Sequence, residues 1–216
     1  NDPVQARAMD REDIRNLRRW HRAAAIRAKQ AGFDLVYVYG AHGFGAVQHF
    51  LSRRTNQRSD EYGGSLENRA RLLLEVIAAV SEVRGSDRVG VRISPLNSYN
   101  SMIDSDPVGL ATFLAGRLND FKLAYLHAMR GDFFGLQKGD VMTPIRAHYR
   151  GVLIANMGYS PAEAAAAVAA GKVDAVAFGT SFLANPDLPA RIRAGAALNA
   201  PDPKKFYSPG PAGYTD

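Results

Sequence analysis

The sequence predicts a parallel α/β fold made of five strand–helix units, and three observations support this prediction. Short segments rich in β-branched and aromatic residues alternate with longer segments in which apolar residues recur at steps of three and four. Capping residues and glycines separate the two kinds of segment. Strands that alternate with helices run parallel, because only a crossover connection reaches a parallel neighbour.

The first two elements and the loop after them differ clearly in composition. A helix is expected over residues 10–31, where Asp10 caps an apolar face and Gly32 ends the helix. Residues 33–39 are rich in β-branched and aromatic side chains and predict a strand. Residues 45–65 form a long polar loop on the expected active-site side, and long ordered loops of compact domains are usually functional.

The rest of the chain continues the alternation. Ser65 opens a second helix, whose inward face carries Leu66, Ala70, Leu73, Ile77 and Val80. The elements that follow are a strand over 89–93, a helix over 108–119, a strand over 123–129, a helical segment over 142–149, a strand over 152–155, a helix from the Ser160–Glu163 capping box to Gly171, a strand over 175–178 and a short helix over 188–194.

Two architectures suit this order of elements: a doubly wound sheet and a closed (β/α)8 barrel of the TIM type. No G-x-G-x-x-G motif follows the first strand, which disfavours a dinucleotide-binding sheet. A closed barrel takes roughly 250 residues, and five units do not close one. We therefore expect residues 1–216 to be a single partial-barrel domain. Its open sheet edges would be covered by upstream strands, by another chain or by self-association.

The composition limits the classes of function. The chain has 216 residues, a net charge of +6 and no cysteine, so it forms no disulfide, thiolate zinc site or cysteine-ligated iron–sulfur cluster. It has no apolar run of membrane-spanning length, and we expect a cytoplasmic protein without a membrane partner. Its basic residues are scattered among acids, so we expect no nucleic-acid partner; an anionic cofactor also explains the excess charge.

Candidate catalytic residues lie where the expected strands end, because parallel barrels build their active sites at the carboxyl ends of the strands. Tyr39 and His42 are three residues apart around a glycine, which suggests hydrogen-bond donors or a proton-transfer pair; a buried Tyr–His contact is the alternative. Asp132 follows the third strand as a further candidate, with a loop-capping carboxylate as its alternative. His127 is interpreted as a core histidine rather than a catalyst.

Two other features indicate an anionic ligand. Arg92 stands in an otherwise apolar strand, where an unpaired charge is costly, so a functional anion contact is favoured over a structural ion pair. Gly158 and Gly179 open the turns after the last two strands, which form the phosphate site of many parallel barrels. The alternative for these glycines is that they only permit tight turns.

Two motifs resemble the old yellow enzyme superfamily of FMN-dependent oxidoreductases. They are the string DEYGGSLENR over 60–69 and the string RVGVRISP over 88–95. The resemblance covers nearly the whole chain and implies strands four to eight of the family barrel. It implies FMN as cofactor, with NAD(P)H as a possible electron donor. It also implies that Arg92 approaches the N1/C2 carbonyl region of the flavin.

The same resemblance assigns further cofactor contacts. Met157–Gly158 and Gly179–Thr180 would cradle the FMN phosphate, although the family commonly has Gly-Arg where this chain has Gly-Thr. In the tail over 196–216, Phe206 and Tyr207 would lie beside the dimethylbenzene edge of the flavin, followed by a family-like Gly-Tyr-Thr-Asp end.

The two parts of the chain resemble enzymes with different chemistries. Residues 33–69 are most similar to trimethylamine, dimethylamine and histamine dehydrogenases, in which a Tyr–His–Asp arrangement corresponds to Tyr39, His42 and Asp132. Those enzymes attach FMN through a cysteine and carry a 4Fe-4S cluster, and this chain has no cysteine. Residues 88–216 are most similar to ene reductases, whose usual tyrosine proton donor is replaced here by Phe44, a candidate substrate-binding residue.

We therefore expect an FMN-dependent ene reductase that transfers hydride from reduced flavin to an activated alkene or a similar small substrate. An amine dehydrogenase is the alternative enzyme. A catalytically silent partial-barrel scaffold is the alternative of another class. The mixture of resemblances also suits a recombined or engineered chain.

Overall fold

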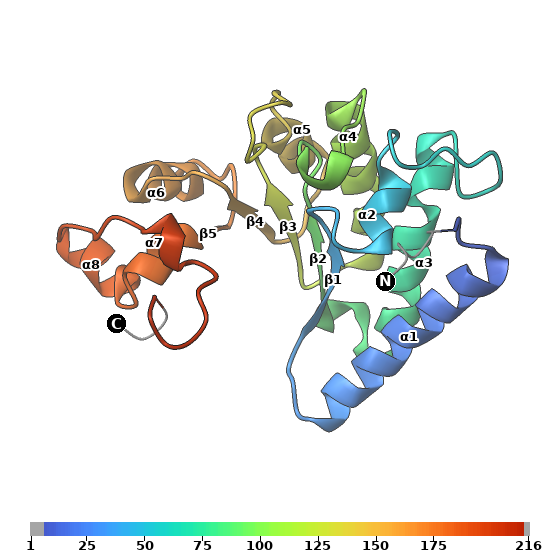
Figure 1. The fold of residues 1–216 in the computed structure, drawn as a ribbon, viewed down its shortest axis with the longest axis horizontal. Coiled ribbons are helices and arrows are strands. Elements are labelled where there is room, and N and C mark those ends of the chain that lie inside the picture. Colours follow the sequence, from blue (N-terminus) through green and yellow to red (C-terminus); the bar gives the residue numbers. More distant parts are fainter. Residues whose placement is uncertain (1–6, 214–216) are drawn as a thin grey trace.

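The computed structural model describes residues 7–213, and its centre is a five-stranded sheet in which every neighbouring pair of strands is parallel (Figure 1). The strands lie in chain order: β1 (Val36–Gly40), β2 (Val89–Ile93), β3 (Tyr125–Met129), β4 (Leu153–Asn156) and β5 (Ala175–Ala177). The parallel α/β fold and its five strands are thus confirmed. An order that follows the chain is that of a barrel wall, because doubly wound sheets reverse their strand order.

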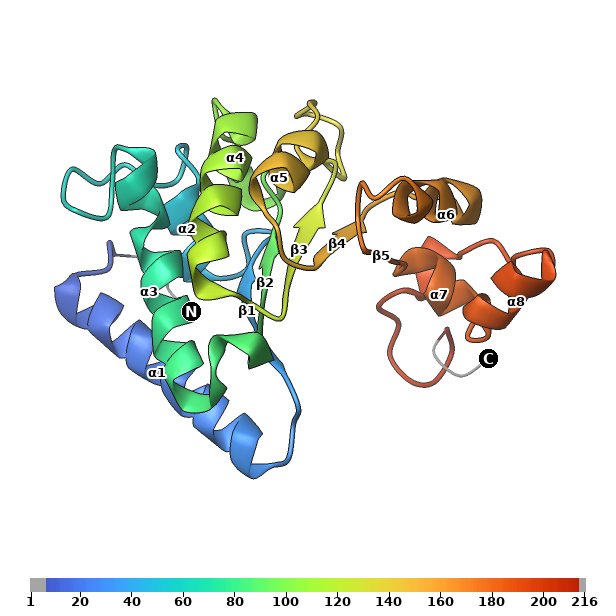
Figure 2. The ribbon, with the colours of Figure 1, turned by 180° about the vertical axis from the view of Figure 1, so that it is seen from behind.

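The helices follow the expected alternation. They are α1 (Arg11–Gln30), α2 (Ala46–Leu51), α3 (Leu66–Arg84), α4 (Pro107–Leu118), α5 (Met142–His148), α6 (Pro161–Ala169), α7 (Thr180–Ala184) and α8 (Leu188–Ala194), with 3-10 turns at Ser86–Arg88, Tyr99–Ser101, Asn119–Phe121 and Pro203–Lys205. The long helix α1 lies across α3, and α4 packs beside α5 (Figures 1 and 2). The units α6 to α8 extend beyond β5, away from this body (Figure 2).

Local capping chemistry explains where the long helices begin. The Asp10 side chain accepts a hydrogen bond from the Asp13 amide, and the Asp13 side chain accepts one from the Asp10 amide, which completes a capping box. Ser65 caps α3 through the Asn68 amide. Ser160 caps α6 through the Glu163 amide.

The two faces of the sheet differ in polarity, because side chains alternate along each strand. One face is apolar and buried under the helices; it includes Val38, Val89, Val91, Ile93, Leu126, Ala128, Leu153 and Ala155. The other face carries Tyr37, Tyr39, Arg92, Tyr125, His127, Ile154 and Asn156, which are exposed or half-buried. This second face, which lines the inside of the curved sheet, is called the inner face below. It holds nearly all the polar side chains of the sheet.

The first, third and fourth strands begin later than the sequence predicts, because a strand needs a partner. Residues 33–35 precede β1, whose first residue, Val36, pairs with Val89 at the start of β2. Likewise β3 begins at Tyr125, which pairs with Gly90. The segment 45–65 is also not entirely loop, since it opens with α2, a six-residue helix.

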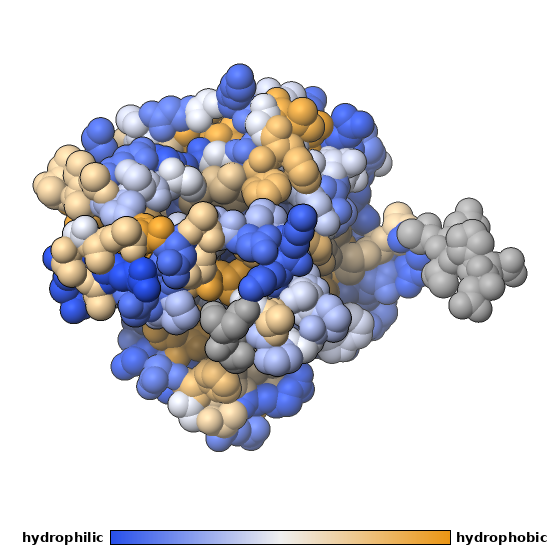
Figure 3. Space-filling view, turned by 60° about the vertical axis from the view of Figure 1, so that its left-hand side comes forward, coloured by the Kyte–Doolittle hydropathy of each residue, from blue (hydrophilic) through white to orange (hydrophobic). Residues whose placement is uncertain are grey.

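Both edges of the sheet are open within residues 7–213. There β1 pairs only with β2, and β5 pairs only with β4. On the side of α7 and α8, apolar and hydrophilic residues are interspersed rather than gathered in one large patch (Figure 3). Within residues 7–213, no helix has both the length and the apolar character needed to cross a membrane. Coverage of the two edges by further chain stays a prediction.

Candidate active site

A row of polar side chains crosses three strands on the inner face. The register places Tyr39 of β1 beside Arg92 of β2, and Arg92 beside His127 of β3. Nη1 of Arg92 lies 3.3 Å from Nδ1 of His127. Nε of Arg92 is buried and has no hydrogen-bond partner within residues 7–213. A buried donor without a partner is costly, which is the pattern expected where a ligand supplies the acceptor.

His127 belongs to this row and not to the apolar core beneath the helices. It is half-buried, and its neighbours Leu126 and Ala128 point the opposite way and are fully buried. Burial first, and then the charge of Arg92, lower the pKa of His127 from 6.5 to about 4. The expected position of His127 in the apolar core is therefore corrected. The alternation of the strand places it on the face of Arg92.

The predicted pair Tyr39 and His42 is brought together. The Tyr39 hydroxyl hydrogen-bonds Nδ1 of His42. Burial, reinforced by the charge of Arg92, lowers the pKa of His42 to about 4, so its ring is neutral at pH 7. Burial raises the pKa of the Tyr39 phenol, and the charge of Arg92 opposes that rise. The pair is therefore a neutral hydrogen-bonding unit at the carboxyl end of β1.

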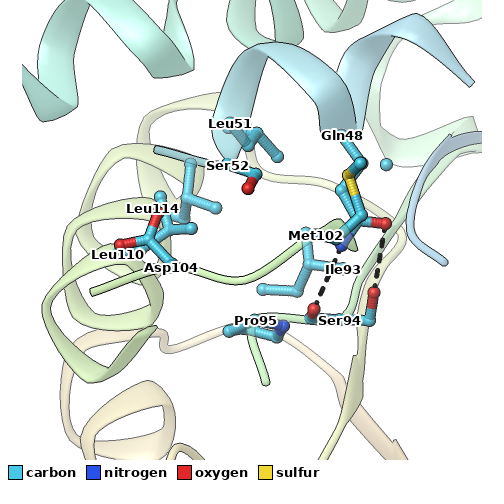
Figure 4. A pocket seen from close by; sticks show the side chains of 11 residues that line it. Gln48, Leu51, Ser52, Ile93, Ser94, Pro95, Met102, Asp104, Leu110 and Leu114 are labelled. Atoms are coloured by element: carbon cyan, nitrogen blue, oxygen red, sulfur yellow. Dashed lines mark hydrogen bonds between the residues drawn. The ribbon is translucent and has the colours of Figure 1, made fainter. Parts of the chain in front are cut away.

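The loop after β1 is held so that His42 faces the site. His42 adopts a left-handed backbone conformation with φ 59°, which is uncommon for a residue other than glycine. Its amide donates to Oγ of Ser94 at 2.9 Å, and the Gly43 amide donates to Oε1 of Gln48 at 2.6 Å. Ser94 and Gln48 are themselves joined by two hydrogen bonds (Figure 4). Sequence reasoning missed this support, since it joins residues about fifty positions apart.

Met129 is a second neighbour that the sequence did not reveal. Its sulfur lies 3.0 Å from Nε2 of His42. A thioether can accept a hydrogen bond weakly but has no proton to donate. Both nitrogens of the His42 ring are therefore occupied, one by Tyr39 and the other by Met129.

Asp132 does not join this pair. Its carboxylate accepts hydrogen bonds from the amide and the hydroxyl of Ser98, at 3.0 and 2.9 Å, and from the amides of Leu136 and Gln137, at 2.8 and 3.1 Å. Burial acts to raise its pKa, but these hydrogen bonds outweigh that effect and lower it. Within residues 7–213 it has no hydrogen bond to Tyr39 or His42. The structure thus shows the loop-capping alternative, and no Tyr–His–Asp chain is formed.

Phe44 lies at the rim and is 70% exposed. Its ring packs against Tyr99 at 5.3 Å between centroids, and Tyr99 stacks on Phe134 at 5.8 Å. These residues come from the loops after β1, β2 and β3. The position that carries a proton donor in the resembling family is therefore an apolar surface here.

The two predicted phosphate turns lie next to one another. Asn156 pairs with Ala177, so the turns after β4 and β5 leave the same edge of the sheet. Met157 and Gly158 have φ values of 91° and 68°. Gly179 has open space where a Cβ would stand, and the exposed residue Thr180 begins α7.

The tail residues differ in exposure. Phe206 is half-buried and helps to line a pocket with Leu183 and Ala184 of α7. Tyr207 is 95% exposed. The family-like end of the chain, from residue 214 on, lies outside the described residues.

The string over 60–69 has a structural part in this fold. Arg69 pairs with Asp104 at 2.7 Å, and both side chains are almost fully buried. Arg58 pairs with Asp60 at 2.6 Å. Asp104 borders a cavity of about 10 Å³ between α2, β2 and α4, which has room for no more than about one water molecule (Figure 4). This cavity is not the ligand site.

Fold and site together define a class: a parallel barrel-wall protein with a polar inner face and with glycine-containing turns side by side after its last two strands. Residues 1–199 match the model of the NADH:flavin oxidoreductase / NADH oxidase family. The chain belongs to this family, and the resemblance to the old yellow enzymes is confirmed.

Individual relatives agree with this assignment. The chain is 50% identical over 209 residues to a protein of Leishmania infantum described as a probable flavin mononucleotide-dependent alkene reductase, covering 97% of this chain and 57% of the relative. It is 41% identical over 215 residues to a putative 12-oxophytodienoate reductase 11 of Oryza sativa subsp. japonica, covering 97% of this chain and 58% of the relative. The chain therefore spans little more than half the length of these relatives.

Solved structures confirm the fold as part of a barrel. Morphinone reductase superimposes with a TM-score of 0.92 at 44% identity, covering 99% of this chain and 57% of that structure. The old yellow enzyme from Trypanosoma cruzi superimposes with a TM-score of 0.92 at 40% identity, covering 96% of this chain and 56% of that structure. The sheet is therefore the wall of a partial (β/α)8 barrel, as predicted. FMN is the cofactor that the family assignment supports.

The residues present fit FMN. Nε of Arg92 offers a buried donor without a partner on the inner face. Gly90 lies on the same face, two residues before Arg92. A Cβ at this position would lie 2.3 Å from the ring of Tyr125, so only glycine leaves room for that ring. The edge after β4 and β5 offers backbone amides to a phosphate. Thr180 contributes a hydroxyl but no charge to this edge.

Proposed function

We propose that this chain forms the cofactor-binding and substrate-binding part of an FMN-dependent ene reductase, with a reduced nicotinamide dinucleotide as electron donor. The observation that carries the proposal is the inner-face row Tyr39–Arg92–His127, in which Arg92 keeps a buried donor without a partner at the carboxyl end of the sheet. Bound FMN would supply hydride from its N5 position to the alkene.

The residues of the row have distinct roles in this proposal. Arg92 binds the pyrimidine side of the flavin and stabilises negative charge that develops on the reduced ring. His42 donates from Nε2 to the oxygen of the substrate's activating group in place of its weak contact with the sulfur of Met129, and Tyr39 holds the ring through its hydrogen bond to Nδ1. His42 suits this role because its pKa of about 4 keeps it neutral near pH 7, so it contributes a polar N–H without a positive charge.

The turns after β4 and β5 complete the cofactor site. Met157, Gly158, Gly179 and Thr180 would surround the phosphate, and Phe206 and Tyr207 would cover the dimethylbenzene edge of the flavin. Phe44 would line the substrate side at the rim. These assignments are supported by the shared edge of the two turns and by the exposure of Phe44 and Tyr207.

Flavin binding and reduction of an enone test the proposal. The purified chain is mixed with FMN, and the visible absorbance and the quenching of flavin fluorescence are measured. Anaerobic addition of NADPH or NADH, followed by 2-cyclohexenone, should bleach and then restore the flavin absorbance. A chain that quenches no flavin fluorescence would contradict the proposal and favour a silent scaffold.

An amine dehydrogenase is the second candidate function. One observation favours it, namely the hydrogen bond between Tyr39 and His42. The third member of the expected arrangement is absent from the pair, because Asp132 caps a loop instead. Oxidation of trimethylamine by the flavin-loaded chain, followed as flavin bleaching, would support this second candidate.

The proposal extends to partners and location. β1 and β5 each have one unpaired edge within residues 7–213, and exposed edges promote pairing with other strands. We propose that further strands or a second copy cover them. Light scattering of the purified chain tests self-association. A cytoplasmic location is part of the same proposal, and cell fractionation tests it.

A further inference from the structure

One arginine holds the turn after β4 and determines where the backbone groups of that turn point. Nε of Arg130 donates to the carbonyl of Met157 at 2.7 Å, and Nη2 donates to the carbonyl of Gly158 at 2.8 Å. No peptide bond within residues 7–213 is cis. In a trans peptide the carbonyl and the next N–H point in opposite directions. The amides of Gly158 and Tyr159 therefore point away from Arg130.

These two amides are free to bind a ligand. Within the described part of the chain, neither the Gly158 nor the Tyr159 amide donates a hydrogen bond to another residue. Both lie in the turn beside Gly179 and Thr180, because the register joins Asn156 to Ala177. Neighbouring free amides at such an edge bind anions such as phosphate.

The turn needs support from outside its own backbone. Met157 has a φ of 91°, a left-handed conformation that a residue with a side chain adopts only when its surroundings enforce it. Arg130 provides that support by donating to the carbonyls of Met157 and Gly158, which lie on the two sides of Gly158. A planar guanidinium can hold two carbonyls at once, whereas an ammonium group acts as a single point.

Arg130 is itself fixed from two sides. Its guanidinium pairs with the carboxylate of Glu163 in the first turn of α6, where Nη2 lies 3.1 Å from Oε2. Its carbon Cζ lies 3.6 Å from the centroid of the Tyr159 ring. The donors of the guanidinium are thus directed at protein groups, so Arg130 acts through the turn rather than by direct contact with a ligand.

We propose that Arg130 is the positioning residue for the phosphate of FMN: it orients the Gly158 and Tyr159 amides toward the phosphate in a chain that has Thr180 where an arginine is common. This inference rests on the proposed binding of FMN. Arg130 follows the last residue of β3, and its amide donates to the carbonyl of Asn156, the last residue of β4 before the turn.

Comparing FMN with riboflavin tests the inference, because riboflavin has the same ring system and no phosphate. Dissociation constants of both flavins are measured by fluorescence quenching for the unsubstituted chain and for Arg130→Met. The substitution should raise the Kd for FMN about tenfold and leave the Kd for riboflavin unchanged. An unchanged Kd for FMN would overturn the inference.

A matched control comes from Arg146. It also pairs with an acid, Asp174, and donates to the carbonyls of Tyr149 and Gly151, but it does so before β4, at the other end of the sheet. Its side chain is 24% exposed, against 27% for Arg130. Arg146→Met should leave the ratio of the two dissociation constants unchanged.

Two further measurements keep the inference testable if Arg130→Met fails to fold. Arg130→Lys keeps the positive charge but loses the planar guanidinium that holds two carbonyls, so this variant should bind FMN as weakly as Arg130→Met. Full affinity for FMN in Arg130→Lys would show that charge alone matters and would overturn the inference. In the unsubstituted chain, inorganic phosphate should shift the NMR signals of the Gly158 and Tyr159 amides. Absence of these shifts would also overturn the inference about Arg130. Failure of the unsubstituted chain to bind either flavin would overturn the proposed function instead.

Discussion

The hydroxyl of Tyr39 bonds to one ring nitrogen of His42, while the other ring nitrogen lies 3.0 Å from the sulfur of Met129. The ring is neutral near pH 7, since its pKa is about 4, so only one of its nitrogens carries a proton. The thioether sulfur of Met129 can accept a hydrogen bond from a ring N–H, but it has no proton to donate. Nε2 therefore carries the proton, and Tyr39 donates its own proton to Nδ1.

Tyr39→Phe should impair enone reduction by the flavin-loaded chain. Loss of the hydroxyl removes the donor that holds Nδ1 of His42, so the Nε2–H is no longer fixed toward the substrate oxygen, and kcat/KM should fall about a hundredfold. Stopped-flow measurement of flavin reoxidation by 2-cyclohexenone gives this value.

Tyr37→Phe is the control for that experiment. Tyr37 lies on the same face of β1, two residues earlier, and is 51% exposed. Its ring is 6.1 Å from that of Tyr39, centroid to centroid. Equal losses in both variants would show that the Tyr39 hydroxyl has no special part.

Arg92→Ala should weaken flavin binding and slow hydride transfer. The substitution removes the half-buried cation of the inner face, which contacts His127 and forms no ion pair with an acid within residues 7–213. Flavin content after purification and the rate of flavin reduction by NADPH are the measurements. Arg88→Ala is the control, because Arg88 belongs to the same motif and is 51% exposed. Unchanged flavin content with lower stability would instead indicate a purely structural arginine.

Acid should destabilise the chain through two histidines. Burial, together with the charge of Arg92, lowers the pKa values of His42 and His127 to about 4 from the ordinary 6.5. Folding thus favours the neutral rings: their contribution to stability is fully present above about pH 6.5 and is lost as the pH falls toward 4.

His127→Asn isolates this effect. The variant cannot take up the proton at position 127, so its Tm should fall less steeply between pH 6.5 and 4, corresponding to about one proton fewer bound on unfolding. Thermal unfolding followed by circular dichroism across this range provides the comparison. His148→Asn is the control, because His148 lies on the surface at the end of α5. Parallel Tm curves for His127→Asn and the unsubstituted chain would contradict the prediction.

Features that depend on local pattern could be predicted from the sequence. The alternation of a strand is enough to place Arg92 on the face opposite Val91 and Ile93, and the structure shows it there. The N-cap at Ser160 is equally local, and α6 begins directly after it, although the Glu163 carboxylate expected to complete a capping box pairs with Arg130 instead. The three-residue spacing of Tyr39 and His42 predicts that they meet, and they do.

Features that depend on distant partners could not be predicted. Asp132 is held by Ser98, 34 residues away, and sequence spacing gives no sign of it. Arg130 binds the carbonyls of Met157 and Gly158, and backbone acceptors leave no trace in side-chain patterns. The helix α2 has six residues and no side-chain cap, so it lacks the usual signals of a helix start.

Thr180→Arg should strengthen the binding of FMN. Thr180 is exposed at the start of α7, where an added guanidinium can reach an anion held by the two turns. The Kd for FMN should fall about tenfold, while the Kd for riboflavin should not change. Ala190→Arg adds the same charge on α8 and serves as control. A similar gain in the control would indicate a general charge effect.

The last prediction concerns Phe44 and separates ene reduction from amine oxidation. Reduction of an enone ends with delivery of a proton to carbon, and the side chain of Phe44 has none to give. It is 70% exposed and packs on Tyr99, so a hydroxyl at its ring end can be accommodated without disturbing the core. Phe44→Tyr should therefore raise the rate of enone reduction by the flavin-loaded chain.

Phe133→Tyr provides the comparison for this substitution. Phe133 is 72% exposed and packs edge-to-face on Phe134, with 5.4 Å between the ring centroids. The Phe133→Tyr substitution therefore adds a similar hydroxyl to the rim at a different place. Steady-state rates with 2-cyclohexenone should rise for Phe44→Tyr alone. Amine oxidation needs no such donor, because the amine loses protons rather than gaining one at carbon. An unchanged enone rate in Phe44→Tyr, together with flavin bleaching by trimethylamine, would therefore favour amine oxidation.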